Sequence, residues 1–166
     1  MVRLDGVEAT TRSIVYKGVS AYNVDYSNLD RSDINNTTIL FTFGECDIRR
    51  HLPKYKNPEE VVEKYVNTSL KFFKGLDVVF MQPVPQAIDE LTYEFNSNKE
   101  AWHPFEERMA QQKIFYESLK NYNQKVIDIS EAIGIDHLTS EYTDDGCHLT
   151  RKTAIDLVRY INIAVN

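Results

Sequence analysis

The fold of this chain follows from residues 38–49, which read TILFTFGECDIR. The first six residues form a continuous run of β-branched and aromatic side chains, which is typical of a strand buried on both faces of a parallel sheet. The run ends at Gly44, and three ionisable side chains follow at alternate positions, Glu45, Asp47 and Arg49. Because ligands of open α/β sheets bind beyond the carboxyl ends of the strands, this segment is a candidate functional site. The alternative is a polar loop in which Arg49 pairs with one of the two acids.

Composition excludes several classes of protein. The chain has 166 residues, a net charge of −6, and hydrophobic and aromatic shares of 42% and 11%, which are typical of one globular domain. The negative charge disfavours nucleic acid as a partner, because binding its backbone requires a basic surface. No apolar run approaches the ~20 residues that cross a membrane, and residues 1–12 lack the apolar core of a secretory signal. Two cysteines, Cys46 and Cys147, are too few for a disulfide framework, so a cytoplasmic location is the default expectation.

Strand-like runs alternate with helical patterns along the chain. Strands are predicted at residues 13–16, 38–43, 77–81 and 125–129. Helices are predicted over residues 57–75, from residue 104, briefly from residue 130 and after Thr150, and residues 21–37 are predicted to hold a short helix and a loop. This alternation indicates βαβ units, and hence a single α/β domain over residues 1–166 with a mostly parallel sheet.

Apolar stripes predict which face of each helix is buried. In the first helix the stripe is Val62, Val66, Leu70 and Phe73. In the second it is Phe105, Met109, Tyr116 and Leu119, and in the last it is Ala154, Val158, Ile161 and Val165.

A second group of polar residues, Asp145-Gly146-Cys147-His148, precedes the last helix. An aspartate three residues before a histidine can fold back so that its carboxylate accepts from one ring nitrogen, which leaves the other nitrogen free to act as a base. Gly146 provides the backbone freedom that such a turn requires. A surface turn before a helix cap contains the same residue types, so the pattern alone leaves both interpretations open.

Together the two polar segments resemble motifs of the SGNH (GDSL-like) hydrolases. Residues 44–49 are similar to the Gly-Glu-x-Asp-x-Arg block of one branch of that family, and residues 145–149 are similar to its Asp-x-x-His-Leu block. Weaker similarities lie at residues 17–21, for a glycine-bearing block, and at residues 81–85, for a strand end with prolines. The four blocks occur in family order.

The resemblance implies a flavodoxin-like three-layer α/β/α sandwich and hydrolysis of an ester, often an acyl or acetyl group on a carbohydrate or lipid. In the implied mechanism a serine is the nucleophile, His148 is the general base and Asp145 orients it. Oxyanion donors would come from Gly18 and from the block that begins at Gly44.

Within that block, Cys46 occupies the position at which many members of the family have an asparagine donor. Arg49 or a backbone N–H would have to replace that donor. The favoured role of Glu45, Asp47 and Arg49 is to brace the loop as a salt-bridged network rather than to act in catalysis.

The resemblance is incomplete at the nucleophile. The family begins with a strand followed by Gly-Asp-Ser, and this chain contains no such tripeptide. In a sheet of order 2-1-3-4-5 that first strand is an interior one. Three alternatives are open: an upstream segment or a second polypeptide completes the sheet, the sheet has closed without the strand, or residues 13–20 take its place. In the third case Ser20 is the nucleophile, and otherwise Ser20 caps the start of a helix.

Two further candidates have both functional and structural interpretations. Trp102 could stack on a sugar ring beside His103, although a lone tryptophan is more often a core or lid residue. Cys46 and Cys147 lack the spacing of zinc ligands, so neither a metal nor a cofactor is expected.

The leading hypothesis is a hydrolase that acts on a carboxylic ester of a small molecule or glycan. The alternative is a catalytically silent SGNH-like module of viral or phage type that binds a glycan or serves in structure or assembly. Neither a nucleic acid nor a membrane is expected as a partner.

Overall fold

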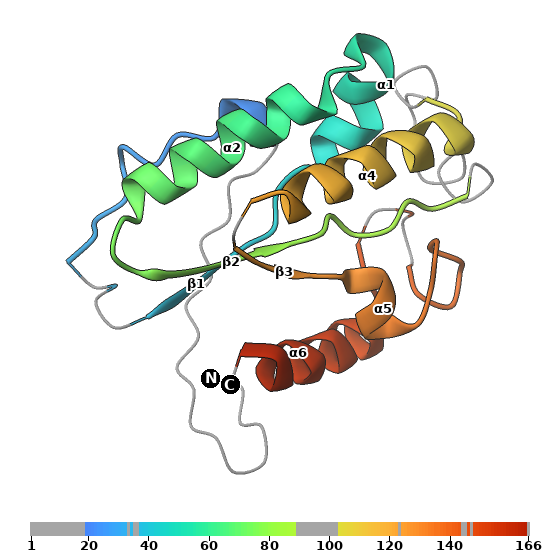
Figure 1. Cartoon of the computed structure of the whole chain (residues 1–166). Coiled ribbons are helices and arrows are strands. Elements are labelled where there is room, and N and C mark those ends of the chain that lie inside the picture. Colours follow the sequence, from blue (N-terminus) through green and yellow to red (C-terminus); the bar gives the residue numbers. More distant parts are fainter. Residues whose placement is uncertain are drawn as a thin grey trace.

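The structure is a computed structural model that describes residues 19–32, 34, 37–88, 103–122, 124–143, 146 and 148–165. Its elements are η1 (Ala21–Asn23), β1 (Thr38–Phe41), η2 (Asp47–His51), α1 (Leu52–Tyr55), α2 (Pro58–Phe72), β2 (Asp77–Met81), α4 (Phe105–Lys120), β3 (Lys125–Ile127), α5 (Ile129–Ile133) and α6 (Arg151–Val165). Helices α2 and α4 lie over one face of the sheet and α6 lies beneath the other, as Figure 1 shows. These three layers confirm the predicted α/β/α fold. The strand predicted at residues 13–16 lies outside the described residues.

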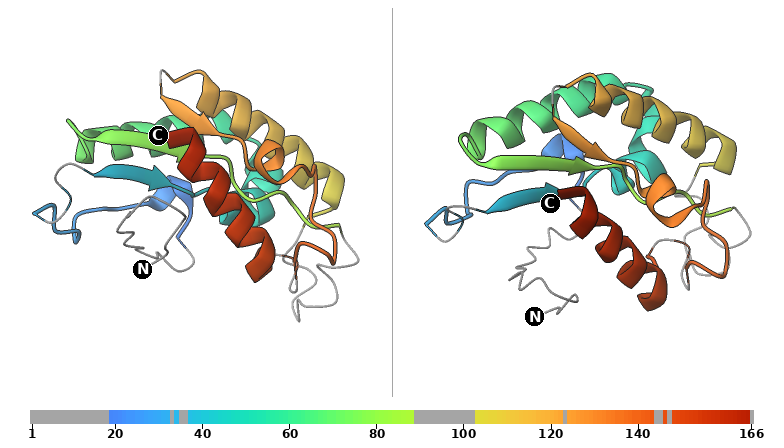
Figure 2. Two further views of the ribbon diagram at one scale, coloured as in Figure 1. Left: turned by 90° about the horizontal axis from the view of Figure 1, so that it is seen from below. Right: turned by 60° about the horizontal axis from the view of Figure 1, so that its bottom comes forward.

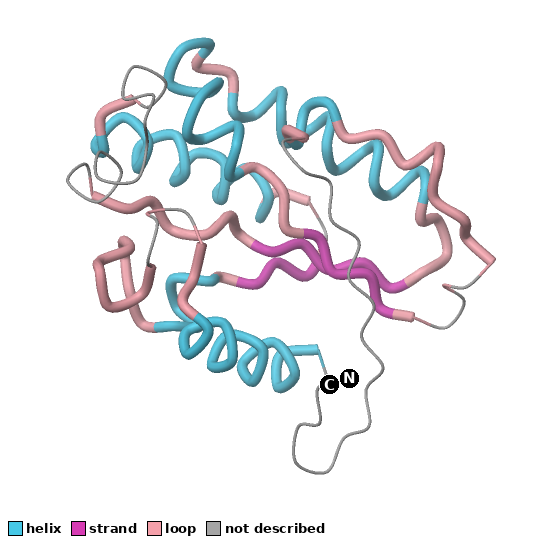
Figure 3. The backbone as a smooth tube through the Cα atoms, turned by 180° about the vertical axis from the view of Figure 1, so that it is seen from behind, coloured by secondary structure: helices cyan, strands magenta, loops and turns pink. Residues whose placement is uncertain are grey.

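The strands β1, β2 and β3 pair in parallel, in that order. They run side by side between the helices (Figure 3). The strand predicted at residues 77–81 is confirmed, and the other two described strands each end two residues earlier than predicted. β1 ends early because the chain leaves the sheet before the turn at Gly44. β3 ends early because the side chain of Asp128 accepts the Glu131 N–H at 3.1 Å and so begins α5.

Aromatic rings fill the layer between the sheet and α2. The ring of Phe41 lies 5.4 Å from that of Phe80 and 5.2 Å from that of Phe73, measured between centroids. Tyr26 and Tyr65 contact the same cluster at 5.6 and 6.2 Å from Phe41. Each such pair contributes about 0.5–1.5 kcal/mol beyond the burial of its area. This cluster therefore fixes β1 and β2 against α2.

A smaller core lies beneath the sheet. Val79 and Met81 of β2 pack there with Ile127, Ile129 and Leu157. Figure 2 shows α6, which carries Leu157, crossing below the strands. Successive residues of β2 thus supply the two cores in turn, as a strand buried on both faces requires.

The stripe predicted for α2 is confirmed, since Val62, Val66 and Phe73 are buried and Leu70 is partly buried. The face predicted for α4 is wrong in part. Its buried residues are Arg108, Gln112, Phe115, Ser118 and Leu119, whereas Phe105, Met109 and Tyr116 are only partly buried. Polar side chains take the inner positions because they hydrogen-bond to the segment that follows β2.

The stripe predicted for α6 is also wrong in part. Val158 is 41% exposed, while Leu157 and Thr153 are buried. The helix packs against residues of β2, β3 and α5, so its buried face is turned toward them and away from Val158. Thr150 caps this helix as predicted, because its Oγ1 accepts the Thr153 N–H at 3.4 Å.

Arg108 joins α4 to both ends of the segment between β2 and α4. Its side chain is fully buried, and its Nε donates to the carbonyl oxygen of His103 at 2.7 Å. One terminal nitrogen donates to the carbonyl oxygen of Ala87 at 2.9 Å and the other to Oε1 of Gln86 at 3.3 Å. A single guanidinium therefore satisfies acceptors from two distant parts of the chain.

We expect Arg108→Met to lower the free energy of unfolding by about 3 kcal/mol, because two backbone carbonyls lose their buried donors. Arg159→Met is the matched control, since Arg159 is exposed on α6 and, among the described residues, pairs with Asp156 across 3.2 Å. It should cost less than about 0.5 kcal/mol. Urea unfolding of both variants measures the difference, and equal losses would contradict the role given to Arg108.

Candidate functional site

The chain leaves β1 through a turn at Gly44 that only glycine fits. Its φ is +109°, and a Cβ at this position would lie 2.6 Å from a ring carbon of Phe115 and 3.0 Å from a ring carbon of Pro83. The carbonyl oxygen of Gly44 accepts the Ile48 N–H at 2.9 Å, so a helical segment begins at once. That segment carries the polar residues that the sequence singles out at the carboxyl end of β1.

Glu45 and Arg49 form an ion pair one helical turn apart. Both side chains are largely buried, with 26% and 15% of their surface exposed. Burial raises the pKa of Glu45 above its ordinary value of 4.5, and the guanidinium of Arg49 opposes this rise. The predicted bracing of the loop by these two residues is therefore present.

Cys46 lies between them in sequence and donates its S–H toward Oε2 of Glu45 across 3.9 Å. Burial, followed by the charge of Glu45, raises the pKa of the Cys46 thiol. The sulfur therefore stays protonated at neutral pH, which is unfavourable for a nucleophile or a metal ligand.

Asp47 braces a different part of the chain than predicted. Its side chain is 1% exposed, and its Oδ2 accepts the backbone N–H of Ala21 at 2.6 Å. Burial raises the pKa of Asp47, while the backbone hydrogen bonds from Ala21 and Tyr22 partly offset this rise. The carboxylate thus ties the segment after β1 to η1, 26 residues earlier in the chain.

Ser20 lies at the start of η1 and is 5% exposed. Its Oγ accepts the Asn23 N–H at 3.2 Å, which confirms the predicted capping interaction. In a nucleophile turn the N–H after the nucleophile faces the oxyanion. Here that group is the Ala21 N–H, which is donated to Asp47.

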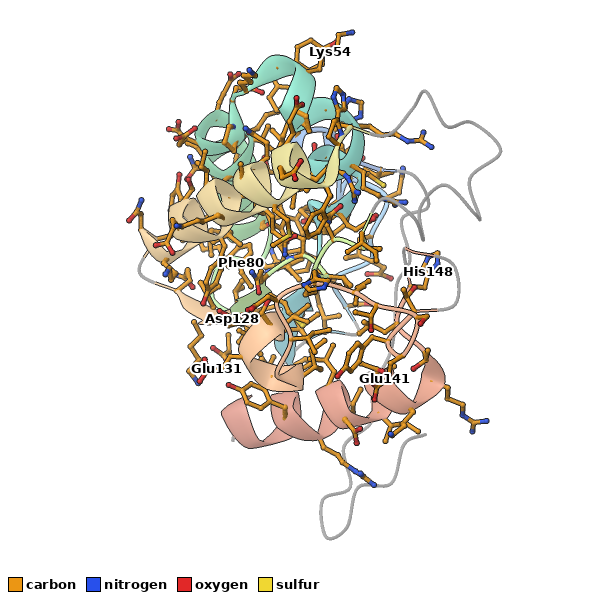
Figure 4. The ribbon with its side chains drawn as sticks, turned by 90° about the vertical axis from the view of Figure 1, so that its right-hand side faces the viewer. Lys54, Phe80, Asp128, Glu131, Glu141 and His148 are labelled. Atoms are coloured by element: carbon orange, nitrogen blue, oxygen red, sulfur yellow. The ribbon has the colours of Figure 1, made fainter. Side chains whose placement is uncertain are left out.

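His148 brings the second polar segment to the same end of the sheet. Burial raises the pKa of Glu45; Arg49 lowers it, and the imidazolium form of His148 lowers it less. Figure 4 looks onto the end of the sheet at which the strands finish, and exposed His148 lies there on the opposite side from Asp128 and Glu131. The structure therefore brings Glu45, Arg49 and His148 to one region, and ties Ser20 to it through Asp47.

Among the remaining predicted site residues, the structure describes His103. His103 is partly buried, and its Nδ1 lies 3.5 Å from a carboxylate oxygen of Glu107. Gly18, Trp102 and Asp145 lie outside the described residues. Arg108, which holds the backbone next to His103, escapes sequence reasoning because an arginine within a helix is ordinarily exposed.

On the part of the surface that the structure describes, two hollows lie away from these residues. One of about 310 Å³ is lined by Tyr116, Lys125, Asp128, Glu131 and Tyr160, beside β3. None of the candidate residues lines it. In the part of the chain that the structure describes, no three acidic, histidine or cysteine side chains are grouped to hold a metal, and no helix has the length and apolarity to cross a membrane.

The fold is similar to those of solved proteins with low sequence identity. One, named "a putative acylhydrolase", is from Bacteroides fragilis, with 16% identity, a TM-score of 0.65, and coverage of 90% of this chain and 71% of that one. Another, named "a putative platelet activating factor", is from Streptococcus pneumoniae, with 16% identity, a TM-score of 0.57, and coverage of 78% and 59%. A carbohydrate acetylesterase from Sinorhizobium meliloti has 18% identity, a TM-score of 0.53, and coverage of 77% and 60%.

These similarities confirm an SGNH-like fold, as residues 44–49 and 145–149 suggest, while the branch of the family stays a prediction. The chain spans about three fifths of the length of two of these proteins. No model of a protein family matches the chain, and no curated protein matches its sequence.

We expect Gly44→Ala to destabilise the protein more than Gly75→Ala. Gly75 also has a positive φ, of +87°, but a Cβ there would meet no atom within 4 Å. Gly75→Ala should cost about 1 kcal/mol for the backbone alone. Gly44→Ala should cost about 1–3 kcal/mol more, because the ring of Phe115 must move. Thermal and urea unfolding measure both values, and equal costs would exclude steric contact as the reason for glycine at position 44.

The buried carboxylate of Asp47 predicts a pH dependence of stability. Its raised pKa means that the folded state holds the proton more tightly than the unfolded chain, so wild-type stability falls as pH rises through the window above 3.8. Asp47→Asn keeps an acceptor for the Ala21 N–H and does not titrate. The stability of this variant relative to wild type should therefore rise with pH in that window and then become constant.

Asp25→Asn is a control for which we expect stability to change with pH in the opposite direction. Hydrogen bonds from the backbone and side chain of Ser27 lower the pKa of Asp25. Wild type should therefore gain stability relative to this variant as pH rises toward 3.8. Urea unfolding at a series of pH values tests both, and slopes of the same sign would show that burial does not govern the titration of Asp47.

Proposed function

We propose that this chain is a hydrolase of a carboxylic ester, with its site at the carboxyl end of the sheet. The observation that supports the proposal is that exposed His148 lies at the end of the sheet at which β1 finishes and the segment of Glu45 and Arg49 follows, on an SGNH-like fold. Ligands of parallel α/β sheets bind at this end. The names of two similar structures, an acylhydrolase and a carbohydrate acetylesterase, agree with this class of reaction.

In the proposed mechanism His148 acts as general base. A serine Oγ attacks the ester carbonyl while His148 takes its proton, and the proton then passes to the leaving alkoxide. Water hydrolyses the acyl-serine by the same route. Asp145 is proposed to orient His148, and Gly18 and the Gly44 block are proposed to supply the donors to the oxyanion.

Ser20 is the candidate nucleophile within this chain. It is linked to the charged segment through the hydrogen bond between Ala21 and Asp47. To react, its Oγ must exchange the Asn23 N–H for His148, and its exposure must increase from 5%. Trp102 and His103 are proposed to contact the alcohol part of the substrate, a glycan or a small molecule.

The second candidate function is a catalytically silent module that binds a glycan or serves in assembly. The capped, buried state of Ser20 favours it, because a nucleophile ordinarily faces the substrate. The two proposals predict different results in a single assay.

Hydrolysis of p-nitrophenyl acetate separates them. If the chain is an esterase with Ser20 as nucleophile, His148→Ala lowers kcat by at least ~100-fold, and Ser20→Ala reduces the rate to background. His51→Ala is the control, because His51 is exposed at the end of η2, and its activity should match wild type.

Two other outcomes decide against parts of the proposal. A loss with His148→Ala but not with Ser20→Ala would assign the nucleophile to another residue. An absence of activity in a folded wild-type protein, verified by circular dichroism, would favour the silent module.

A further inference from the structure

The helical segment that follows β1 carries a concentration of positive charge. Residues 49–56 read RRHLPKYK, and no acid occurs among residues 48–58, although the whole chain has a net charge of −6. Arg49 pairs with Glu45. The other three cations of this stretch are exposed and form no ion pair among the described residues: Arg50, Lys54 and Lys56.

Buried apolar side chains turn these cations outward. Ile48 and Leu52, four residues apart, are fully buried, and α1 packs against η2 and α4. The opposite side of the same helical segment therefore faces solvent. Tyr55 lies there and is 60% exposed, and the ammonium of Lys54 is 5.0 Å from the centroid of its ring. Four residues form what we call the basic patch: Arg50, Lys54, Tyr55 and Lys56.

Local stability accounts for only part of the basic patch. Cations near the carboxyl end of a helix are favourable, and Lys54 and Lys56 lie at that end of α1. However, Lys56 has a φ of +54°, a conformation that favours glycine. Arg50 lies in the middle of the helical segment, away from its carboxyl end. The helix end therefore does not explain why cations occupy these two positions.

Further cations lie on the other side of the candidate functional site. Arg151 and Lys152 begin α6 directly after the loop of His148, and both are exposed. Positive charge is unfavourable at the start of a helix, and neither residue forms an ion pair within the part of the chain that the structure describes. In Figure 4, which faces this end of the sheet, His148 lies between Lys54 above and α6 below.

The distribution of these charges over η2, α1 and α6 favours a polymeric anion. A nucleic acid is a poor fit, because its dense backbone charge requires a continuous basic surface and this chain is acidic overall. A membrane is also a poor fit, because Tyr55 is the only member of the patch that could insert an apolar group. A glycan with carboxylate or sulfate groups has more widely spaced charges, and the C–H faces of its sugars can pack on an exposed aromatic ring.

We propose that the basic patch binds an acidic glycan, whose carboxylate or sulfate groups pair with Arg50, Lys54 and Lys56. The patch continues directly from the segment of Glu45 and Arg49. The glycan bound there is therefore the polymer whose ester is hydrolysed at the neighbouring site. This identification of the substrate rests on the proposed function, whereas the binding itself does not.

The binding is measured on the whole chain by isothermal titration calorimetry, without any assay of hydrolysis. The probe is a short oligogalacturonate, and its control is the same oligomer after reduction of the carboxyl groups to alcohols. The reduced oligomer after sulfation forms a third arm, and the tighter of the two acidic forms identifies the anion. That form should bind at least ~10-fold more tightly than the neutral oligomer, with an affinity that falls as salt is added.

Lys54→Gln combined with Lys56→Gln should weaken the binding by at least ~5-fold, because two cations are lost. The matched control combines Lys71→Gln with Lys74→Gln. These exposed lysines lie near the end of α2, at the amino end of β2, so the same change in net charge should leave the affinity unchanged. Tyr55→Ala should weaken the binding by at least ~3-fold through loss of its contact with a sugar. Circular dichroism verifies that each variant is folded.

Four results would overturn the proposal. Equal losses in the two double variants would assign the binding to net charge alone. An affinity unaffected by Tyr55→Ala would mean that no sugar is recognised. Equal affinities for the acidic and neutral oligomers, or no binding of either, would mean that the patch does not select an acidic glycan. Tighter binding of an oligothymidylate with the same number of charges, or of phosphatidylserine vesicles, would assign the patch to a nucleic acid or a membrane.

The same measurements separate this inference from the proposed function. A chain that binds the acidic oligomer but hydrolyses no ester would support the glycan site and contradict the hydrolase. A chain that hydrolyses p-nitrophenyl acetate but does not distinguish the acidic from the neutral oligomer would support the hydrolase and contradict the glycan site.

Discussion

The packing of the Phe41 ring is the contact on which the rest of the structure depends. Phe41 is the last residue of β1, and its ring contacts Phe80 on β2 and Phe73 beyond the end of α2. These contacts set the depth of β1 beneath α2 and its register against β2. The chain consequently leaves the sheet at a defined point and turns at Gly44 directly beside the ring of Phe115. The core thus determines where the charged segment begins.

Two buried carboxylates then connect that segment to the rest of the protein. Each would cost several kcal/mol to bury without partners. Glu45 has the guanidinium of Arg49, and Asp47 has the N–H of Ala21. The first interaction is local, while the second reaches back to η1 across a long stretch of sequence. They position the chain rather than add net stability, because Glu45 braces the segment after β1 and Asp47 holds that segment against η1.

Sequence patterns predicted the described strands and the long helices because apolar spacing reports directly on burial. They also predicted the cap at Thr150 and the ion pair of Glu45 with Arg49, both of which depend on residues within one helical turn. The buried face of α4 could not be predicted in the same way. Arg108 and Gln112 are buried because carbonyl groups near β2 accept from them, and a periodicity of apolar residues does not contain that information.

The sequence by itself determined the order of strands and helices, the glycine turn after β1 and the two polar segments at residues 44–49 and 145–148. Only the tertiary structure decided which of these residues meet. It bound Asp47 to Ala21, turned Ser20 inward, placed His148 at the end of the sheet where β1 finishes, and left Leu40 38% exposed. The physical reason is the separation along the chain of the residues in contact. Spacing along the chain records contacts within an element, whereas contacts between distant segments depend on how the whole sheet and its helices pack.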